Sequence, residues 1–298
     1  MKVLNFGSLN LDYVYDVDHF VMAGETISSN SLIMNLGGKG FNQAVALTRA
    51  GVPQLYLAGL VGEDGLIFYD TCKDFGINTD YLKTVTGQCG HAIIQVNKSG
   101  ENSIILFGGA NQKNSKEYVD EVLSHFEEGD MLILQNEVNE LKYIIDQAFL
   151  KGMTIVLNPS PFNEKILECD LGKVSIFLLN KVEGQQLTGQ VTPSAILSFM
   201  EANYPNSRVV LTMGEGGAIY HAGNEEMYQP SFKVEVVDTT AAGDTFSGFF
   251  IASLIKKMPI REGLTIAAKA AAMAVMANGA VKSIPFMSEV ELKDLNAL

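Results

Sequence analysis

The sequence predicts an α/β protein with a doubly wound, mostly parallel sheet flanked by helices and a small β-sheet lid. Short apolar runs alternate with helical patterns along most of the chain. These runs are continuously apolar, as expected of parallel strands covered on both faces. Two regions, at about residues 11–36 and 88–108, break the alternation with strand pairs that have no helix between them.

The elements of the main sheet and its helices follow one another in a regular order. Strands are expected at residues 2–6, 54–61, 131–135, 154–158, 175–180 and 208–213. Helices are expected at residues 40–51, 64–76, 139–152 and 192–205, with a further buried helix at 267–281. Glycines end three of these helices, and Thr192 followed by Pro193 is typical of the start of a fourth.

The two interrupting regions have the pattern of β-hairpins. Residues 11–17 pair in pattern with 31–36, and residues 90–97 pair with 102–107. Together they could form one small sheet beside the main domain, covering the strand ends where α/β proteins bind ligands. No repeat or linker is visible, so residues 1–298 are interpreted as a single domain into which the lid strands are inserted.

Composition restricts the classes of function. The 298 residues are 47% apolar, and 21 basic against 34 acidic residues give a formal net charge of −13. That charge argues against a nucleic-acid surface, although local N–H groups can still bind an anion. Cys72, Cys89 and Cys169 are odd in number and form no CxxC, which favours a reducing cytoplasm over disulfides. No membrane partner is expected, because the apolar stretch 267–281 is interrupted by Lys269 and Asn278.

The stretch "DTTAAGDTFSG", residues 238–248, places small residues just before a helical pattern. Free N–H groups at a helix start suit an anion, and Ala241, Ala242 and Gly243 leave room for a phosphate to approach them. Asp244 has two interpretations. It is a helix N-cap, or it accepts a proton from an alcohol that attacks phosphorus.

Two further stretches suit a hydroxyl-rich ligand. "NLGGKGFNQAV", residues 35–45, matches neither Walker A nor GxGxxG, but its glycines allow close approach and Asn42 can donate and accept hydrogen bonds. In "GSLNLD", residues 7–12, Asn10 and Asp12 alternate and so point the same way from a strand. The competing interpretations are a tight strand-to-helix turn and an ordinary polar strand face.

Carboxylates also follow predicted strands. Asn180 and Glu183 in "LNKVEG" come after a buried strand, where Glu183 would organise Mg²⁺ or simply occupy a first helical turn. Glu137 follows another strand end in the same way. The glycines of "MGEGGA", residues 213–218, lack the spacing of a dinucleotide loop, and the four histidines lack metal-ligand spacing.

These motifs, in this order, resemble those of the ribokinase-like (pfkB-type) carbohydrate kinase family, closest to its ribokinase branch. "GGKGFNQA" is similar to the family's N-terminal signature, "DTTAAGDTFSG" to its C-terminal signature and "NKVE" to its Asn-x-x-Glu motif. "GENSIILFGGAN" resembles a lid strand of the same branch. The sequence departs at Phe41, where a small residue is usual, and at "LFGGAN", where a proline commonly precedes Gly-Ala-Asn.

The resemblance implies a role for each matching residue. Asp244 would be the catalytic base, with an anion hole formed by the N–H groups of Ala241, Ala242 and Gly243. Sugar contacts would come from Asn10, Asp12, Gly38, Lys39, Asn42 and Glu137. ATP contacts would come from Asn180, Thr212 and Gly214, with Glu183 organising Mg²⁺ through water.

A monovalent cation such as K⁺ is expected beside the anion hole. Asp238 and Thr240 flank the turn that leads to Asp244, and the second loop, residues 277–283, would add Ala277, Gly279 and Ser283. Alternatively, Asp238 only caps its turn, or the ammonium group of Lys282 replaces the ion. The resemblance also implies a homodimer through the lid.

The expected activity is ATP-dependent phosphorylation of the primary hydroxyl of D-ribose, which yields ribose 5-phosphate. A kinase for another sugar or for a nucleoside is the alternative, and Phe41 is a candidate apolar wall for a nucleobase. A protein that binds sugar or nucleotide without catalysis is a third, and the intact Asp244 stretch argues against it.

Overall fold

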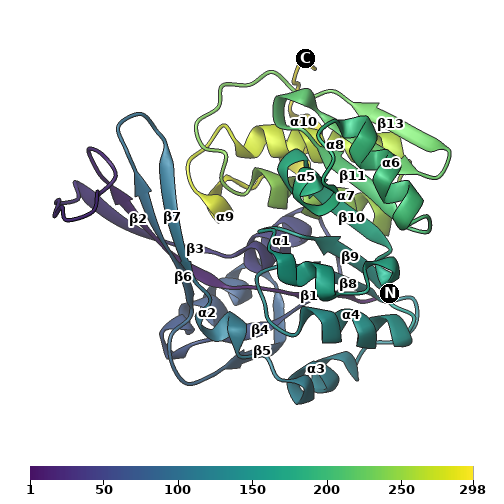
Figure 1. Ribbon diagram of the computed structural model, residues 1–298, viewed down its shortest axis with the longest axis horizontal. Coiled ribbons are helices and arrows are strands. Elements are labelled where there is room, and N and C mark those ends of the chain that lie inside the picture. The colour runs from purple at the N-terminus through teal and green to yellow at the C-terminus, as the bar shows by residue number, and fades with distance from the viewer. Residues whose placement is uncertain (298) are drawn as a thin grey trace.

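A nine-stranded sheet forms the centre of the computed structural model, which describes residues 1–297 (Figure 1). Its order is β13-β12-β11-β10-β9-β8-β1-β4-β5, and the seven strands from β11 to β5 are parallel. β12 and β13 form an antiparallel edge. The strands are β1 (Val3–Phe6), β4 (Leu55–Val61), β5 (Asn78–Thr84), β8 (Met131–Gln135), β9 (Thr154–Asn158), β10 (Ile176–Asn180), β11 (Arg208–Thr212), β12 (Ala218–Ala222) and β13 (Glu225–Gln229).

Helices cover both faces of this sheet, which confirms the predicted doubly wound class. Val3 of β1 packs into the core beneath α1, α7 and α8, whereas its neighbour Leu4 packs into the core beneath α3, α4 and α6. Successive strand residues point to opposite faces, so continuously apolar strands supply both cores. The helices are α1 (Lys39–Arg49), α2 (Ile67–Phe75), α3 (Lys116–Leu123), α4 (Leu141–Leu150), α5 (Lys181–Thr188), α6 (Pro193–Asn203), α7 (Ala242–Ile255), α8 (Ile260–Ala274), α9 (Ala280–Ser283) and α10 (Met287–Leu292).

A separate four-stranded sheet projects from the body, at the left of Figure 1. Its order is β3-β2-β6-β7, with β2 (Asn10–Asp16), β3 (Ser31–Gly37), β6 (Gly90–Val96) and β7 (Asn102–Phe107). The two expected hairpins are present as antiparallel pairs, and parallel pairing of β2 with β6 joins them. We call this sheet the lid.

Some elements differ from the sequence prediction. The expected helix at 267–281 is wrong in its second half, because α8 ends at Ala274 and Gly279, with φ of 91°, turns the chain before α9. Strand β5 and the β12–β13 hairpin were not predicted, since their partly exposed residues lack the continuous apolar runs of the central strands. Among residues 1–297 no helix combines the length and hydropathy needed to cross a membrane, and the longest, α8, has 15 residues.

Candidate active site

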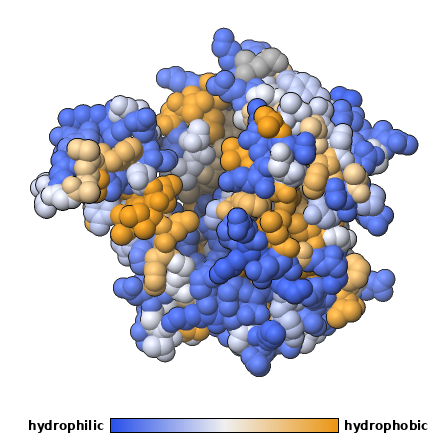
Figure 2. Space-filling model, viewed as in Figure 1, coloured by the Kyte–Doolittle hydropathy of each residue, from blue (hydrophilic) through white to orange (hydrophobic). Residues whose placement is uncertain are grey.

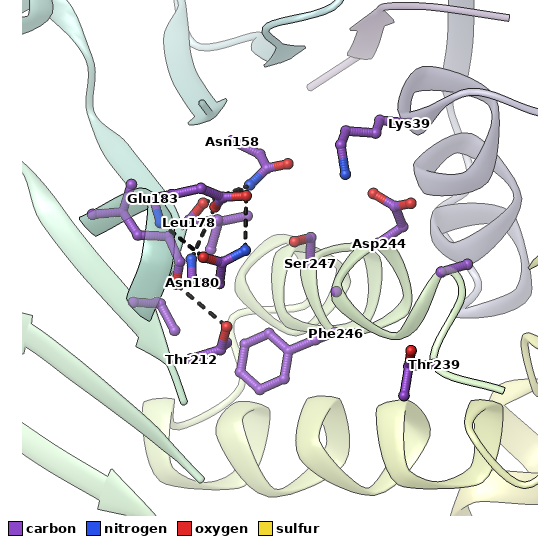
Figure 3. Close-up of a pocket in the computed structure, with 14 residues that line it drawn as sticks. Lys39, Asn158, Leu178, Asn180, Glu183, Thr212, Thr239, Asp244, Phe246 and Ser247 are labelled. Carbon is purple, nitrogen blue, oxygen red and sulfur yellow. Dashed lines mark hydrogen bonds between the residues drawn. The ribbon is translucent and has the colours of Figure 1, made fainter. Parts of the chain in front are cut away.

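A pocket of about 190 Å³ lies where three parallel strands end and two helices begin (Figure 3). Asn158, Asn180 and Thr212 stand at the carboxyl ends of β9, β10 and β11 and line one side. Lys39 at the start of α1 and Asp244 in the first turn of α7 line the other. This edge of an open α/β sheet is where such folds bind ligands.

The start of α7 borders the pocket, which Ala241 and Gly243 line. Ala241 adopts a left-handed conformation with φ of 59°, an unfavourable geometry for alanine that turns the chain sharply into the helix. Residues of the first turn have no carbonyl one turn earlier in the helix to accept their N–H groups. Of the three predicted donors, the Ala242 N–H is directed at the Thr239 carbonyl over a long 3.3 Å. A Cβ placed on Gly243 would meet nothing within 4 Å, so open space lies beside this residue.

Asp244 is not a helix cap, which overturns one of its two interpretations. The N-cap position belongs to Ala241, and Asp244 lies three residues further into the helix. Its carboxylate is buried and accepts two hydrogen bonds from α1, one at Oδ2 from Asn42 Nδ2 (3.0 Å) and one at Oδ1 from Gln43 Nε2 (2.9 Å). Figure 3 shows Asp244 beside the ammonium group of Lys39, with both side chains pointing into the pocket.

The ammonium group of Lys39 lies among three carboxylates of the site. Burial acts to lower the pKa of Lys39, but the surrounding carboxylates of Asp244, Glu137 and Glu183 outweigh it and raise that pKa. A cation with a raised pKa stays charged at neutral pH and can meet further negative charge. Lys39, predicted as a sugar contact, lines the pocket together with Asn180 and Glu183.

The predicted sugar residues gather around the root of the lid. Glu137 Oε2 accepts hydrogen bonds from the backbone N–H of Lys39 (2.9 Å) and from the hydroxyl of Ser8. Burial, and secondly the negative charge of Glu137, raise the pKa of Asp12 to about 7. Gly38 has φ of 90°, and a Cβ there would lie 2.8 Å from the backbone N of Asn10, so only glycine fits this approach of β3 to β2.

The predicted nucleotide residues form a hydrogen-bonded group across the pocket from Lys39 (Figure 3). Asn180 is the N-cap of α5 and forms a capping box with Glu183, so the interpretation of Glu183 as a first-turn residue is confirmed. Glu183 is buried and still lines the pocket, and Asn158 Nδ2 approaches its carboxylate at 3.5 Å. Thr212 lines the same pocket, whereas Gly214 lies in the next turn and is not among its lining residues. Among residues 1–297 no group of three or more His, Cys, Asp or Glu side chains could hold a metal ion.

Asp238 joins the two loops that the sequence assigned to a monovalent cation. Its Oδ1 accepts hydrogen bonds from the Thr240 N–H and hydroxyl (2.9 and 2.6 Å), and its Oδ2 accepts from the Gly279 N–H (2.9 Å). Burial acts to raise the pKa of Asp238, but these hydrogen bonds outweigh it and lower that pKa. The loops therefore meet, Ser283 turns its hydroxyl to the Ala280 carbonyl, and Lys282 is exposed.

Comparisons with known proteins agree with this geometry. Residues 1–287 match the pfkB family of carbohydrate kinases. The chain belongs to this family. It is 35% identical over 290 residues to a ribokinase of Bacillus subtilis, covering 96% of each chain. A ribokinase of Cryptococcus neoformans solved in complex with ADP superposes with a TM-score of 0.84 at 32% identity, covering 97% of this chain and 98% of that one. An Arabidopsis thaliana ribokinase complexed with ribose and ATP superposes with a TM-score of 0.83 at 28% identity, covering 97% of each chain.

Phe41, the residue that departs from the usual pfkB signature, does not line the site. Its side chain is fully buried and packs edge-on against Phe68, with ring centroids 5.1 Å apart. The hypothesis of an aromatic wall for a nucleobase at this position is therefore wrong. Phe41 stands between Lys39 and Asn42 in α1. Because neighbouring positions on a helix are about 100° apart, its side chain points away from both.

Sequence reasoning also missed two residues that line the pocket of this kinase and one that contacts Asp244 from outside it. Asn158 ends β9 just as Asn180 ends β10, so the same signal of a polar residue after a buried strand would have found it. Ser247 lies three residues after Asp244 and therefore on the same face of α7. Gln43, the second partner of Asp244, gave no such signal, because a lone glutamine in a helix is usually solvent-facing.

Proposed function

We propose that this protein is an ATP-dependent kinase that phosphorylates the primary hydroxyl of D-ribose and yields ribose 5-phosphate. One observation carries the proposal. The buried Asp244 carboxylate, held by Asn42, opens into the same pocket as Lys39 and the first turn of α7. A base, a cation and backbone donors within one pocket are the equipment of phosphoryl transfer to an alcohol. The relatives named ribokinase support ribose as the alcohol.

The reaction then proceeds as an in-line transfer. The hydroxyl oxygen of the sugar bonds to the γ-phosphorus of ATP, the bond from that phosphorus to the β–γ bridging oxygen breaks, and ADP leaves. The hydroxyl proton passes to the carboxylate of Asp244. Lys39 and the N–H groups at the start of α7 neutralise the negative charge that spreads over the moving phosphoryl oxygens.

We propose two cations for the site. Mg²⁺ usually keeps several waters in addition to substrate phosphates, and the buried Glu183 would organise the ion through such water. When bound, Mg²⁺ would neutralise phosphate charge. We place K⁺ at Asp238 and Thr240 with the carbonyls of the loop containing Ala277, Gly279 and Ser283, because Asp238 already joins these loops. Equal rates in K⁺, Na⁺ and tetramethylammonium at matched ionic strength would contradict this second site.

The lid is proposed to mediate a homodimer. Strand pairing aligns Met34, Ile93 and Ile105 across the lid, so their side chains lie on one face. Ala92 and Leu106 align with Asp12, and their side chains lie on the other face. Met34, Ile93, Ile105 and Leu106 are all exposed, and Figure 2 shows apolar residues gathered on the lid. A four-stranded sheet cannot bury apolar residues on two faces by itself. A monomeric mass by light scattering at micromolar concentration would contradict the dimer.

We also propose a cytoplasmic location, because the cysteines are not oxidised. Cys72, Cys89 and Cys169 are all free and buried, a state that a reducing compartment preserves. ATP as the phosphoryl donor agrees with that compartment. Secretion into an oxidising medium with loss of the free thiols, followed by thiol titration, would contradict it.

The test of the proposed activity is ADP release with MgATP against a panel of acceptors. D-ribose, deoxyribose, fructose, ketodeoxygluconate and nucleosides are compared by kcat/KM, and ribose is expected to rank first. A higher value for another acceptor would transfer the proposal to that acceptor, with kinase chemistry retained. Turnover with none of them would favour a protein that binds sugar or nucleotide without catalysis.

A further inference from the structure

We infer that Gln43 is a positioning residue for Asp244, and that a chain of buried amides anchored in the central sheet fixes the direction of the catalytic carboxylate. The inference rests on the proposed function, since it concerns the group that accepts the hydroxyl proton. Gln43 follows Asn42 in α1 and is completely buried, and it is not among the residues that line the pocket. Its route to the chemistry therefore runs through Asp244.

The hydrogen bonds of Gln43 allow only one orientation of its amide. Gln43 Nε2 donates to Asp244 Oδ1 (2.9 Å), and Gln43 Oε1 accepts from Gln135 Nε2 (2.7 Å). If the amide were flipped, its oxygen would face a carboxylate oxygen and its NH₂ would face the NH₂ of Gln135. Both contacts would then be repulsive, so Gln135 fixes which end of Gln43 meets the base.

The chain of amides continues into the sheet. Gln135, the last residue of β8, also donates from Nε2 to Asn5 Oδ1 (3.0 Å), and Asn5 Nδ2 donates to the Gly40 carbonyl (2.6 Å). Asn5 lies on β1, the neighbour of β8, so two central strands anchor the amides. A Cβ on Gly7 would lie 2.1 Å from Gln135 Oε1, so glycine at position 7 leaves the space that this amide occupies.

The amides are better explained by positioning than by stability. Asn5, Gln43 and Gln135 are all 0% exposed, and burying amides costs free energy that hydrogen bonds only offset. An apolar cluster of the same shape would fill the space at lower cost. A chain of side-chain hydrogen bonds instead specifies one arrangement of its members. Here its last member is Asp244, whose second oxygen is held by Asn42.

A misplaced base slows proton transfer and leaves ligand binding intact, because an efficient transfer needs the carboxylate within hydrogen-bond reach of the hydroxyl. We therefore expect Gln43→Leu to lower kcat about 10- to 100-fold. The dissociation constant for ribose, measured by calorimetry, and the KM for ATP should stay within about twofold of wild type, because Gln43 does not line the pocket.

Two controls separate positioning from a structural role. In an Asp244→Asn background, Gln43→Leu should cause no further loss of kcat, since its only route to the chemistry has been removed. Gln229 is a matched control, since it is also a buried glutamine with hydrogen bonds, to Pro230 and Thr265, but lies on the edge strand β13. Gln229→Leu should leave kcat unchanged.

The outcomes that overturn the inference are equally defined. A Gln43→Leu variant with wild-type kcat would do so. The same holds if Gln43→Leu lowers kcat as much in the Asp244→Asn background as it does when Asp244 is intact. If Gln43→Leu does not fold, Gln43→Met combined with Gln135→Met removes both partners of one hydrogen bond, keeps the volume and takes the same measurements. Absence of ADP release from wild type would contradict the proposed function as well, whereas wild-type turnover with an unaffected variant contradicts only the role of Gln43.

Discussion

The phosphoryl side and the sugar side of the proposed site are built from different parts of the molecule. On the phosphoryl side, Asp244 is buried in the body and held by Asn42 and Gln43 of a packed helix. On the sugar side, Asp12 lies on β2, whose residues pass from buried Asn10 at the root to exposed Asp16 at the outer end. The reacting groups are thus fixed in the body, whereas Asp12 lies on a lid strand that becomes more exposed toward its outer end. Substitutions on the two sides should therefore affect different constants.

The largest effect is expected from Asp244→Asn, which should lower kcat by about 10²–10⁴. Ribose binding, measured by calorimetry, should survive, because asparagine keeps the size of Asp244 and leaves the sugar contacts expected from Asp12, Lys39 and Glu137 unchanged. Both oxygens of Asp244 accept N–H donors, so an asparagine NH₂ must face one of them and the melting temperature should fall by a few degrees. A fully active Asn variant would show that Asp244 is not the base.

Gly243→Ala tests the backbone donors of the same side. The added methyl group meets no protein atom within 4 Å, and alanine is favoured over glycine in a helix by about 1 kcal/mol, so the fold should be retained or stabilised. The methyl group would enter the space in which we place the phosphoryl group. We expect kcat/KM for ATP to fall about 10- to 100-fold with ribose binding unchanged. Unaltered ATP kinetics would place the phosphoryl group elsewhere.

Asp12→Ala tests the sugar side. Loss of a charged hydrogen bond to a hydroxyl should weaken ribose binding by about 1.5–3 kcal/mol, while ATP binding stays the same. Calorimetry with each ligand measures both effects. Asp16→Ala is the matched control, because Asp16 lies on the same strand at its exposed end and should leave ribose affinity unchanged. If both variants weaken binding equally, the strand as a whole is responsible and Asp12 has no specific role.

Site residues that lie in recognisable motifs could be predicted from the sequence. Residues whose role depends on packing between distant segments could not. Asp244 and Asn42 were identified because small residues and glycines surround them. Gln43 was not, because its role depends on meeting Gln135, 92 residues away in the chain. The fold class followed from local apolar runs, whereas β5 and the β12–β13 hairpin form at sheet edges where that signal is weak. Phe41 was misplaced because the motif was interpreted without the helical spacing that turns this side chain away from Asn42 and into the core.

The smallest effect is expected from Asp12→Asn in the absence of ligand, and it depends on pH. Burial, with the charge of Glu137 second, raises the pKa of Asp12 from 3.8 to about 7 in the folded protein. Between these two values the folded state binds more protons than the unfolded state, so this group's contribution to the free energy of unfolding falls as pH rises. Asparagine is neutral throughout and escapes that loss.

Asp12→Asn should therefore be more stable than wild type at pH 8 by on the order of 1 kcal/mol, because Asp12 is only partly buried and solvent reduces the full effect of the pKa shift. The difference should shrink at pH 5, where Asp12 is protonated in the folded wild type. Thermal unfolding at both pH values measures it, with the exposed Asp16→Asn as the control whose difference should not change. Since the charge that destabilises the empty site is the one proposed to grip ribose, added ribose should reverse the order of stabilities at pH 8. An Asn variant no more stable than wild type at pH 8 would mean that water already solvates the Asp12 charge in the ligand-free protein. Asp12 would then not destabilise the empty site, and this difference between the sugar side and the phosphoryl side would disappear.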